Sequence, residues 1–486
     1  MSRCISPRVQ LVLPTILFCL LAMVPAEAAE SAAKEAAVQS VAKHGDELVD
    51  LSDRIWAWAE TALEEYESAD ALAAYAEQQG FEVERGIAGM PTAFVASYGT
   101  GRPIIAVMGE YDALPGISQK AVAEKTPFEE GAAGHGCGHN MFGAASIGAA
   151  VAIKEQIAAG ALDGTVRFYG TPAEEAVGGK TYMARDGVFD DVDVMLAWHP
   201  GDITRADTTS SQAMVDLIVE FEGRTAHAAS DPWNGRSAVD ALELFTDGVN
   251  MMREHIKPTS RMHYAIVAGG DVPNVVPDYS RVWLWLRDWQ RSEVEDLLAR
   301  TRKLADGAAM MTETTATLTV QAGSWEILTN RAGAELIDAN LAWLGTPAYT
   351  PDEQAFAKEI QRATNVPETG IDTAIHPLDG QVEEGGSTDV GDVSWVVPTL
   401  HFTVATAPKD APWHAWPVVA TGGMSIGHKG MLLAAKTLAA TMVDLYEDPE
   451  AVRAITDEFR EKRGDVVFKA YLPEGPPPVP EAPATP

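Results

Sequence analysis

The run Gly-His-Gly-Cys-Gly-His-Asn at residues 134–140 places one thiol between histidines in a setting rich in glycine. Glycine lets the backbone turn sharply, so the alternate side chains of Cys137 and His139 can converge on one metal ion, which would keep the thiol deprotonated. A buried free cysteine beside surface histidines is the alternative. The motif alone favours neither interpretation, and the sequence around it has to decide.

Two predicted core strands near this run lead into acidic residues. The apolar stretch 104–108 is followed by Gly-Glu-Tyr-Asp-Ala-Leu-Pro at 109–115, and the stretch 165–170 is followed by Thr-Pro-Ala-Glu-Glu at 171–175. Carboxylates at the end of a core strand are costly unless they are used, and open sheets place their sites at this edge. Because Glu174 and Glu175 point in different directions, one can bind metal while the other accepts a proton from water. A solvated surface pair is the alternative.

A third apolar stretch, 192–200, ends in Trp-His-Pro and delivers His199 to the same edge, unless that histidine is only a hydrogen-bonded structural one. Apolar residues at helical spacing predict two helices over 32–79 and one over 141–158, and 94–98 is predicted to be a further strand. Strands and helices alternate. This order predicts an α/β catalytic domain with a mixed sheet flanked by helices.

The pattern changes between residues 212 and 324. Strands are predicted at 215–222, 262–268 and 282–286, and helices at 238–253 and 292–312. This order predicts an inserted β-α-β-β-α-β unit, an α+β domain of the ferredoxin-like type. We therefore divide the chain into a signal peptide (1–28), a catalytic domain in two parts (29–211 and 325–472), the inserted domain (212–324) and a disordered, proline-rich tail (473–486).

The amino terminus has the pattern of an exported protein. Two arginines precede an apolar stretch at 9–24 and the small-residue site Ala-Glu-Ala at 26–28, which predicts a signal peptide cleaved after Ala28. A retained membrane anchor is the alternative, but the stretch is shorter than the ~20 residues of a spanning helix. We expect a periplasmic or secreted protein. Cys4 and Cys19 would leave with the signal peptide, so Cys137 could form no internal disulfide.

The formal net charge is −34. A surface this acidic repels the phosphate backbone of nucleic acids and the headgroups of anionic membranes, because like charges meet in each case. Neither nucleic acid nor a membrane is therefore expected as a partner.

Taken in chain order, the motifs at 109–115, 134–140, 172–175 and 198–200 resemble those of the di-metal aminoacylase and carboxypeptidase family of metallopeptidases, over about residues 55–445. The most similar branch is the one typified by the B subunit of p-aminobenzoyl-glutamate hydrolase. The resemblance implies two divalent metal ions, manganese or zinc, with Glu174 as catalytic base and Asp112 orienting a ligand by a hydrogen bond. The metal ligands that it implies in the first half of the chain are Cys137, His139, Glu175 and His199.

Two positions are less clear from the resemblance. Many relatives carry histidine or aspartate where Glu110 stands, so contact of Glu110 with metal stays open. The family also needs a distal histidine, and we assign His414, in the loop after a strand predicted at 399–404. The other candidate, His428, precedes a helix predicted at 431–445. For His428 the alternatives are contact with substrate and capping of that helix. A glycine-bounded acidic loop at 385–395 resembles one that relatives keep beside the site.

In relatives, the inserted unit is a lid that also mediates dimerisation. His227 resembles the lid histidine that reaches into a partner subunit's site and steadies the oxyanion of the tetrahedral intermediate. Asn274 resembles a second lid residue that faces substrate. Arg287 is a candidate contact for a substrate carboxylate, although an arginine at a sheet edge is more often part of a structural ion pair.

The resemblance thus implies an exported metal-dependent amidohydrolase that cleaves the amide bond of an N-acyl or aminobenzoyl amino acid, such as p-aminobenzoyl-glutamate. It implies a small-molecule substrate and a homodimer. Two alternatives stay open: a dipeptidase or aminoacylase of the same family, and a non-catalytic binding subunit of a hetero-oligomer with a paralogous subunit.

Overall fold

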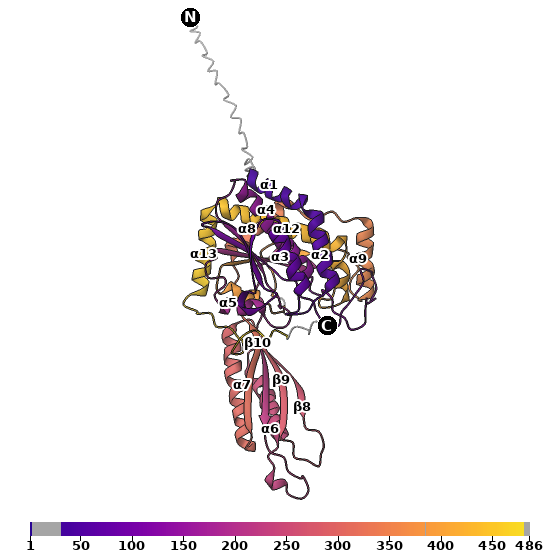
Figure 1. Ribbon diagram of the computed structural model, residues 1–486, viewed down its shortest axis with the longest axis vertical. Coiled ribbons are helices and arrows are strands. Elements are labelled where there is room, and N and C mark those ends of the chain that lie inside the picture. Colours follow the sequence, from indigo (N-terminus) through magenta and orange to yellow (C-terminus); the bar gives the residue numbers. More distant parts are fainter. Residues whose placement is uncertain (2–30, 384, 481–486) are drawn as a thin grey trace.

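The computed structural model describes Met1 and residues 31–383 and 385–480. Apart from Met1, the predicted signal peptide lies outside the described residues. Figure 1 shows a larger body from which a second unit of strands and helices projects. Within the described residues, no helix combines the length and hydropathy that crossing a membrane requires.

A seven-stranded sheet forms the centre of the body, in the order β1-β2-β4-β3-β5-β11-β6. Strand β3 pairs in parallel with β4 and β5, and β11 pairs in parallel with β5, whereas the three remaining pairs are antiparallel. The predicted mixed sheet is therefore confirmed, and the carboxyl ends of four strands meet at one edge. The strands are β1 (Glu82–Arg85), β2 (Phe94–Gly99), β3 (Ile104–Gly109), β4 (Thr165–Gly170), β5 (Val194–Gly201), β6 (Arg205–Ala206) and β11 (Thr399–Ala405).

The first part of the body contains three helices rather than the two predicted over 32–79. They are α1 (Ala32–Lys43), α2 (Gly45–Trp58) and α3 (Tyr66–Gln78). The unexpected break falls at His44, whose ring lies 3.1 Å from a carboxylate oxygen of Glu155 and 3.0 Å from one of Glu47. The spacing of the apolar residues does not depend on this long-range polar contact, so it continues across the break. The spacing alone therefore does not indicate where the first helix ends.

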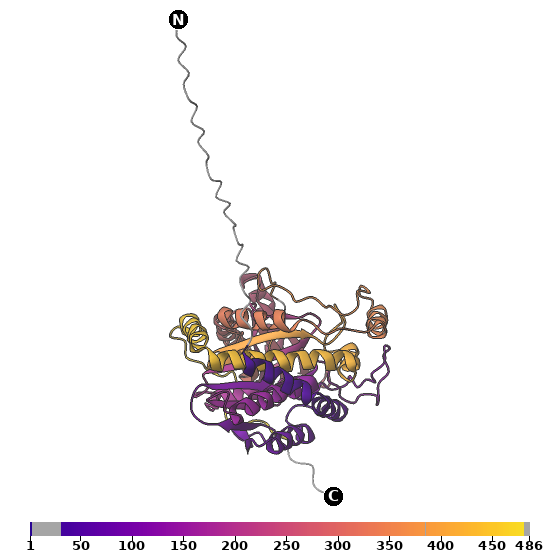
Figure 2. The ribbon, with the colours of Figure 1, turned by 90° about the horizontal axis from the view of Figure 1, so that it is seen from above.

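Two long helices cover one face of the sheet. Helix α4 (His139–Ala158) packs on β2, β3, β4 and β5, and α12 (Ser425–Glu447) packs beside it on β3, β5 and β11. Most side chains of α4 are fully buried because they are small and apolar. Figure 2 shows α12 as the long yellow helix across the middle of the body. The other body helices are α5 (Gly179–Arg185), α8 (Arg331–Leu344), α9 (Pro351–Ala363), α10 (Val390–Ser394), α11 (Trp416–Gly422) and α13 (Pro449–Arg463), with a short 3-10 turn η1 (Ile87–Gly89).

The projecting unit has the predicted β-α-β-β-α-β order. Its four strands form a separate antiparallel sheet, β10-β7-β9-β8, with its own apolar core. Figure 1 shows this unit below the body, with β8 and β9 on one side and α7 on the other. Its elements are β7 (Ala213–Glu222), α6 (Ala238–Met252), β8 (Arg261–Gly269), β9 (Tyr279–Asp288), α7 (Arg291–Thr312) and β10 (Thr315–Ser324), with 3-10 turns η2 (Pro232–Asn234) and η3 (Arg253–His255).

Aromatic side chains fill the junction between the two units. Trp325, 1% exposed, follows β10 and packs on Trp395 of the body and on Phe468 and Tyr471 of the C-terminal segment. Its indole Nε1 donates a hydrogen bond to the carbonyl of Lys469 at 3.1 Å. The C-terminal segment therefore touches both apolar cores.

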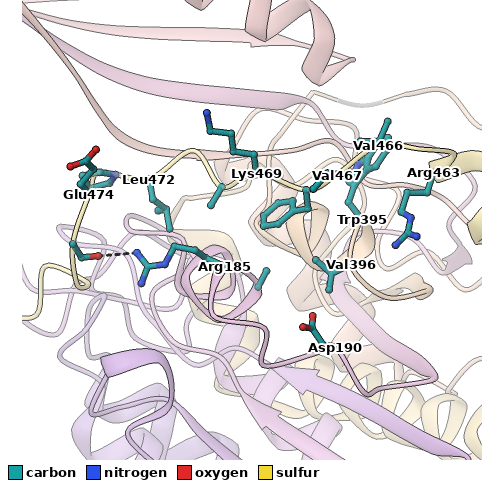
Figure 3. A pocket seen from close by; sticks show the side chains of 15 residues that line it. Arg185, Asp190, Trp395, Val396, Arg463, Val466, Val467, Lys469, Leu472 and Glu474 are labelled. Carbon is teal, nitrogen blue, oxygen red and sulfur yellow. Dashed lines mark hydrogen bonds between the residues drawn. The ribbon is translucent and has the colours of Figure 1, made fainter.

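The described part of the tail, 473–480, contains no helix or strand, yet it does not hang free as a disordered end would. Arg185 donates a hydrogen bond to the carbonyl of Gly475 at 2.8 Å, and Pro477 is buried near Gly89. Figure 3 shows Arg185 where this segment and α5 border a cavity of about 850 Å³. The prolines that suggested disorder also lack an N–H group, so they can pack on the body without leaving a donor unpaired.

Replacing Trp325 with alanine should lower the free energy of unfolding by about 3–5 kcal/mol, because the change removes a large aromatic group from a packed core. Chemical denaturation followed by circular dichroism measures the effect. Trp233→Ala is the matched control, since Trp233 is 71% exposed. Equal stability of the two variants would contradict the packing at the junction.

Candidate metal centre

The common edge of β3, β4, β5 and β11 brings the predicted metal ligands together. One group of ligand atoms that lie within 4.8 Å of one another comes from Cys137, His139 and His199, and a second comes from Cys137, Glu175 and His414. Cys137 belongs to both groups. The two groups therefore offer overlapping sets of sulfur, nitrogen and oxygen donors that could hold divalent metal ions.

Glycines allow the turn that presents the thiol. Gly138 has a φ of 80°, a conformation that favours glycine, and α4 begins at the next residue, His139. A Cβ on Gly136 would lie 2.3 Å from Ile117 and 3.3 Å from the Cα of His414. The loop that carries His414 can therefore come this close only because residue 136 is a glycine. The backbone N–H of His414 also donates to the carbonyl of Gly136 at 3.1 Å.

Asp112 connects two of the predicted ligands. One carboxylate oxygen accepts a hydrogen bond from Nδ1 of His139 at 2.8 Å, and the other accepts from the backbone N–H of Glu175 at 2.8 Å. The bond at Nδ1 leaves Nε2 of His139 for a metal ion. Burial disfavours the charged imidazolium, but the carboxylates of Glu110 and Asp112 outweigh burial and raise the pKa of His139 above its ordinary value.

His199 is held in the tautomer that a metal ligand needs. Its Nδ1 donates to the carbonyl of Pro200 at 2.7 Å, and its Nε2 lies 3.4 Å from the sulfur of Cys137. Burial lowers the pKa of His199 to about 4, so the ring is neutral near pH 7. Burial, together with the nearby carboxylate of Glu175, also raises the pKa of the Cys137 thiol.

The loop between β4 and α5 presents the adjacent glutamates. Ala173 has a φ of 61°, which is strained for a residue with a side chain, and its N–H donates to the buried carboxyl of Glu65 at 2.9 Å. Burial raises the pKa of Glu174 well above its ordinary value, and the nearby carboxylates of Glu110 and Glu175 add to the effect. Burial likewise raises the pKa of Glu175 to about 7. Glu65 was not predicted, because nothing at 60–66 marks a residue that supports a distant turn.

Glu110 lies inside the cluster and has a buried cationic neighbour. One of its oxygens lies 3.0 Å from Nε2 of His139, and the other lies 2.7 Å from the amine of Lys180. The same amine lies 2.7 Å from the carboxylate of Asp389. Sequence reasoning placed 385–395 beside the site but did not connect Lys180 with either acid, since the three residues lie on separate elements.

His414 sits at the rim of the cluster. Its ring is 56% exposed, and Nε2 lies 3.5 Å from an oxygen of Glu175, whose side chain is only 6% exposed. Its backbone has a φ of 52°. The predicted metal ligand that is most open to solvent therefore also has a left-handed backbone conformation, which is strained for histidine.

The remaining predicted site residues lie elsewhere. His428, inside the first turns of α12, pairs with Asp53 of α2 at 2.8 Å. His227, Asn274 and Arg287 all belong to the projecting unit, where the loops that carry His227 and Asn274 pair with each other. Within the described part of the chain, none of the four belongs to a group of possible metal ligands.

Unpartnered buried atoms test whether a metal fits this cluster. Nε2 of His139 and Oε1 of Glu175 are buried and have no hydrogen-bond partner. Buried polar atoms are nearly always hydrogen-bonded unless an ion or water takes the place of the partner. Thiolate and imidazole donors suit zinc, and the carboxylates suit manganese, so the residues fit divalent metal ions of either kind.

Comparison with known proteins gives the same picture. A model of the peptidase family M20/M25/M40 matches residues 106–415. The B subunit of the p-aminobenzoyl-glutamate hydrolase of Escherichia coli is 39% identical over 459 residues, which cover 89% of this chain and 95% of that protein. The Xaa-Arg dipeptidase of Mus musculus is 29% identical over 462 residues, which cover 90% of this chain and 95% of that protein.

Solved structures share the fold. A dinuclear metal binding peptidase of the M20 family from Bacillus subtilis superposes with a TM-score of 0.58 at 18% identity, covering 84% of this chain and 99% of that one. The sequence similarities and the ligand cluster make the chain a metal-binding hydrolase that acts on amide bonds. Because the family match spans more than half of its length, the chain belongs to peptidase family M20/M25/M40.

Proposed function

We propose that this protein hydrolyses the amide bond of an N-acyl or aminobenzoyl amino acid such as p-aminobenzoyl-glutamate. The observation that carries the proposal is the position of Glu174, whose carboxylate lies within 4.8 Å of ligand atoms of His139 and Glu110 but belongs to neither group that contains Cys137. The 39% identity with the B subunit of p-aminobenzoyl-glutamate hydrolase supports the substrate class. The 29% identity with a dipeptidase makes cleavage of short dipeptides the second candidate.

Two divalent ions held by the five ligands would supply Lewis acid chemistry, which polarises the amide carbonyl and acidifies water. Glu174 accepts a proton from the attacking water at its carboxylate and returns that proton to the nitrogen of the leaving amine. Burial and the neighbouring carboxylates raise the pKa of Glu174, which is the direction that strengthens a general base. Asp112 keeps His139 and the Glu175 backbone in place during the reaction.

His227 is suited to stabilise the oxyanion that forms on the carbonyl. The backbone N–H groups of Ala229 and Ser230 donate to its Nδ1 at 3.1 and 3.2 Å. The proton of the neutral ring must then sit on Nε2, which makes this atom a donor. His227 is exposed, as expected for a residue that acts in the site of a partner subunit.

The projecting unit also has a surface suited to a homodimer. Strand β8 lies at the edge of its sheet, and Ile266 and Val267 on this strand are 56% and 53% exposed. An apolar edge strand readily pairs with a strand of another chain. We propose that a second copy pairs at β8. A paralogous subunit is the alternative, because the similar Escherichia coli protein is named a subunit.

Export completes the proposal. Arg3 and Arg8, the apolar stretch 9–24 and Ala28 have the order of a cleaved signal peptide, so we propose a periplasmic or secreted enzyme. Amino-terminal sequencing of the mature protein from the native host should begin at residue 29. Retention of Met1 would contradict export by this route.

Glu174→Gln should lower kcat about 10²- to 10⁴-fold, because the amide keeps the shape of the acid but cannot accept the proton. The metal content should stay at two ions per chain, as measured by mass spectrometry. Glu447→Gln on the exposed end of α12 is the control. The assay uses manganese-loaded enzyme with p-aminobenzoyl-glutamate, hippurate-type acyl amino acids and dipeptides, and activity on dipeptides alone would favour the second candidate.

Arg287→Ala should raise KM about 10- to 100-fold for substrates with a free carboxylate, as expected when a hydrogen bond to a charged group worth about 1.5–3 kcal/mol is lost. Among the described residues, Arg287 stacks on Trp285 and no carboxylate partner is found for it. Arg261→Ala on the neighbouring strand position is the control. The same KM for the amidated substrate in wild type and variant would support the assignment, and an unchanged KM for the free acid would refute it.

Ile266→Asp should convert a dimer into a monomer, because the new charges face each other across the paired edge strands. Light scattering after size-exclusion chromatography measures the mass. Val467→Asp, at an 84% exposed position of the C-terminal segment, should leave the mass unchanged. A wild-type protein that is monomeric at micromolar concentration would rule out the proposed homodimer.

A further inference from the structure

Lys180 is a buried lysine beside the metal cluster for which the reaction above has no role. Its side chain has no exposed surface. The amine donates a hydrogen bond to Asp389 at 2.7 Å, and the backbone N–H of Lys180 donates to the other oxygen of Asp389 at 2.9 Å. Burial disfavours the ammonium, but the carboxylates of Asp389 and Glu110 outweigh burial and raise the pKa of Lys180. The amine of Lys180 therefore lies between two carboxylates, at 2.7 Å from each.

The second contact of Lys180 divides the two oxygens of Glu110 between different partners. Oε1 lies 2.7 Å from the amine of Lys180 at ion-pair distance, and Oε2 lies 3.0 Å from Nε2 of His139. This nitrogen is the one that Asp112 leaves for a metal ion, since Nδ1 is already bound. The oxygen that Lys180 leaves unpaired is therefore turned toward the metal-binding nitrogen.

Without Lys180, repulsion would act on this arrangement. Glu110 lies among Glu174, Glu175 and Asp389, and ligand atoms of Glu110, His139 and Glu174 lie within 4.8 Å of one another. Like charges this close in a buried site repel strongly, so a free Glu110 carboxylate would turn away or displace Glu174. A cation on one side of Glu110 fixes the direction in which its second oxygen points.

We propose that Lys180 is a positioning residue of the metal centre, which holds Glu110 so that Oε2 adds an oxygen donor beside Nε2 of His139. The inference deepens the proposed function and rests on it, because it concerns the same metal ions. The resemblance left open whether Glu110 contacts metal. The proposal explains how a glutamate can serve at this position, because its carboxylate is a useful donor only when a neighbouring cation orients it.

The experiment measures metal affinity rather than turnover. Apo-protein is titrated with Mn²⁺ by isothermal calorimetry, and the spectrum of the Co²⁺-loaded protein reports the coordination. Wild type should bind two ions. Lys180→Met should weaken one of the two sites about 10- to 100-fold, the usual effect of losing a residue that supports a ligand, and should change the Co²⁺ spectrum. The affinity of the other site should stay the same.

The pairing of Lys180 with Glu110 makes the test sharper. Glu110→Gln should weaken the same site, and the double variant E110Q/K180M should lose little more than either single variant, because both changes remove one interaction. Losses that multiply would overturn the proposal, as would a Lys180→Met protein with wild-type affinity at both sites. If Lys180→Met does not fold, two other variants test the proposal: the double variant, which removes both charges, and Lys180→Arg. Each of these should weaken one metal site. Wild-type affinity at both sites in both variants would overturn the proposal.

Thr181→Val separates positioning from simple helix packing. The hydroxyl of Thr181, the next residue in α5, donates to the buried Asp392 of α10 at 2.8 Å and so joins the same two segments as Lys180 does. This variant should bind both ions as wild type does. Equal weakening by Thr181→Val would mean that Lys180 only holds α5 and α10 together. A wild type that binds two ions but cleaves none of the substrates would overturn the proposed function and leave the role of Lys180 intact.

Discussion

Concentrated negative charge at one edge of the sheet is the constraint on which the metal centre depends. The buried carboxylates of Glu110, Asp112 and Asp389 gather there with the partly buried carboxylates of Glu174 and Glu175. Burial raises the pKa of Glu174, Glu175 and Asp389. Cations are needed there, whether as the side chain of Lys180, the ring of His139 or bound metal ions.

The parallel strands are what make such a concentration possible. Strands β3, β4, β5 and β11 end at the same edge of the sheet. Glu110 and Asp112 follow β3, the glutamate pair follows β4 and His414 follows β11, while β5 itself carries His199. The glycine-rich turn before α4 supplies the thiol, and the first residue of α4 is His139. Side chains from distant parts of the sequence thus meet at one edge of the sheet. Only the ring of His414 is largely exposed.

Residues that stand in a local sequence pattern could be named as site candidates from the sequence, and the structure brings them together. Cys137 and His139 stand in a glycine-rich run, and Glu174 and Glu175 follow a strand, so both pairs could be predicted before their meeting point was known. The body sheet and the β-α-β-β-α-β order of the projecting unit followed from periodicity. Interactions that join separate elements could not be predicted in this way. The helix break at His44, the support of Ala173 by Glu65 and the orientation of Glu110 by Lys180 all depend on contacts across the fold.

The C-terminal segment has a consequence for the order of assembly. Each sheet has its own apolar core, but Phe468 and Tyr471, which complete the packing around Trp325, come from the last twenty residues of the chain. Domains generally fold as units, with amino-terminal parts first during synthesis. Both sheets can therefore be complete before Phe468 and Tyr471 pack on Trp325, and the packing that joins the body to the projecting unit forms after them.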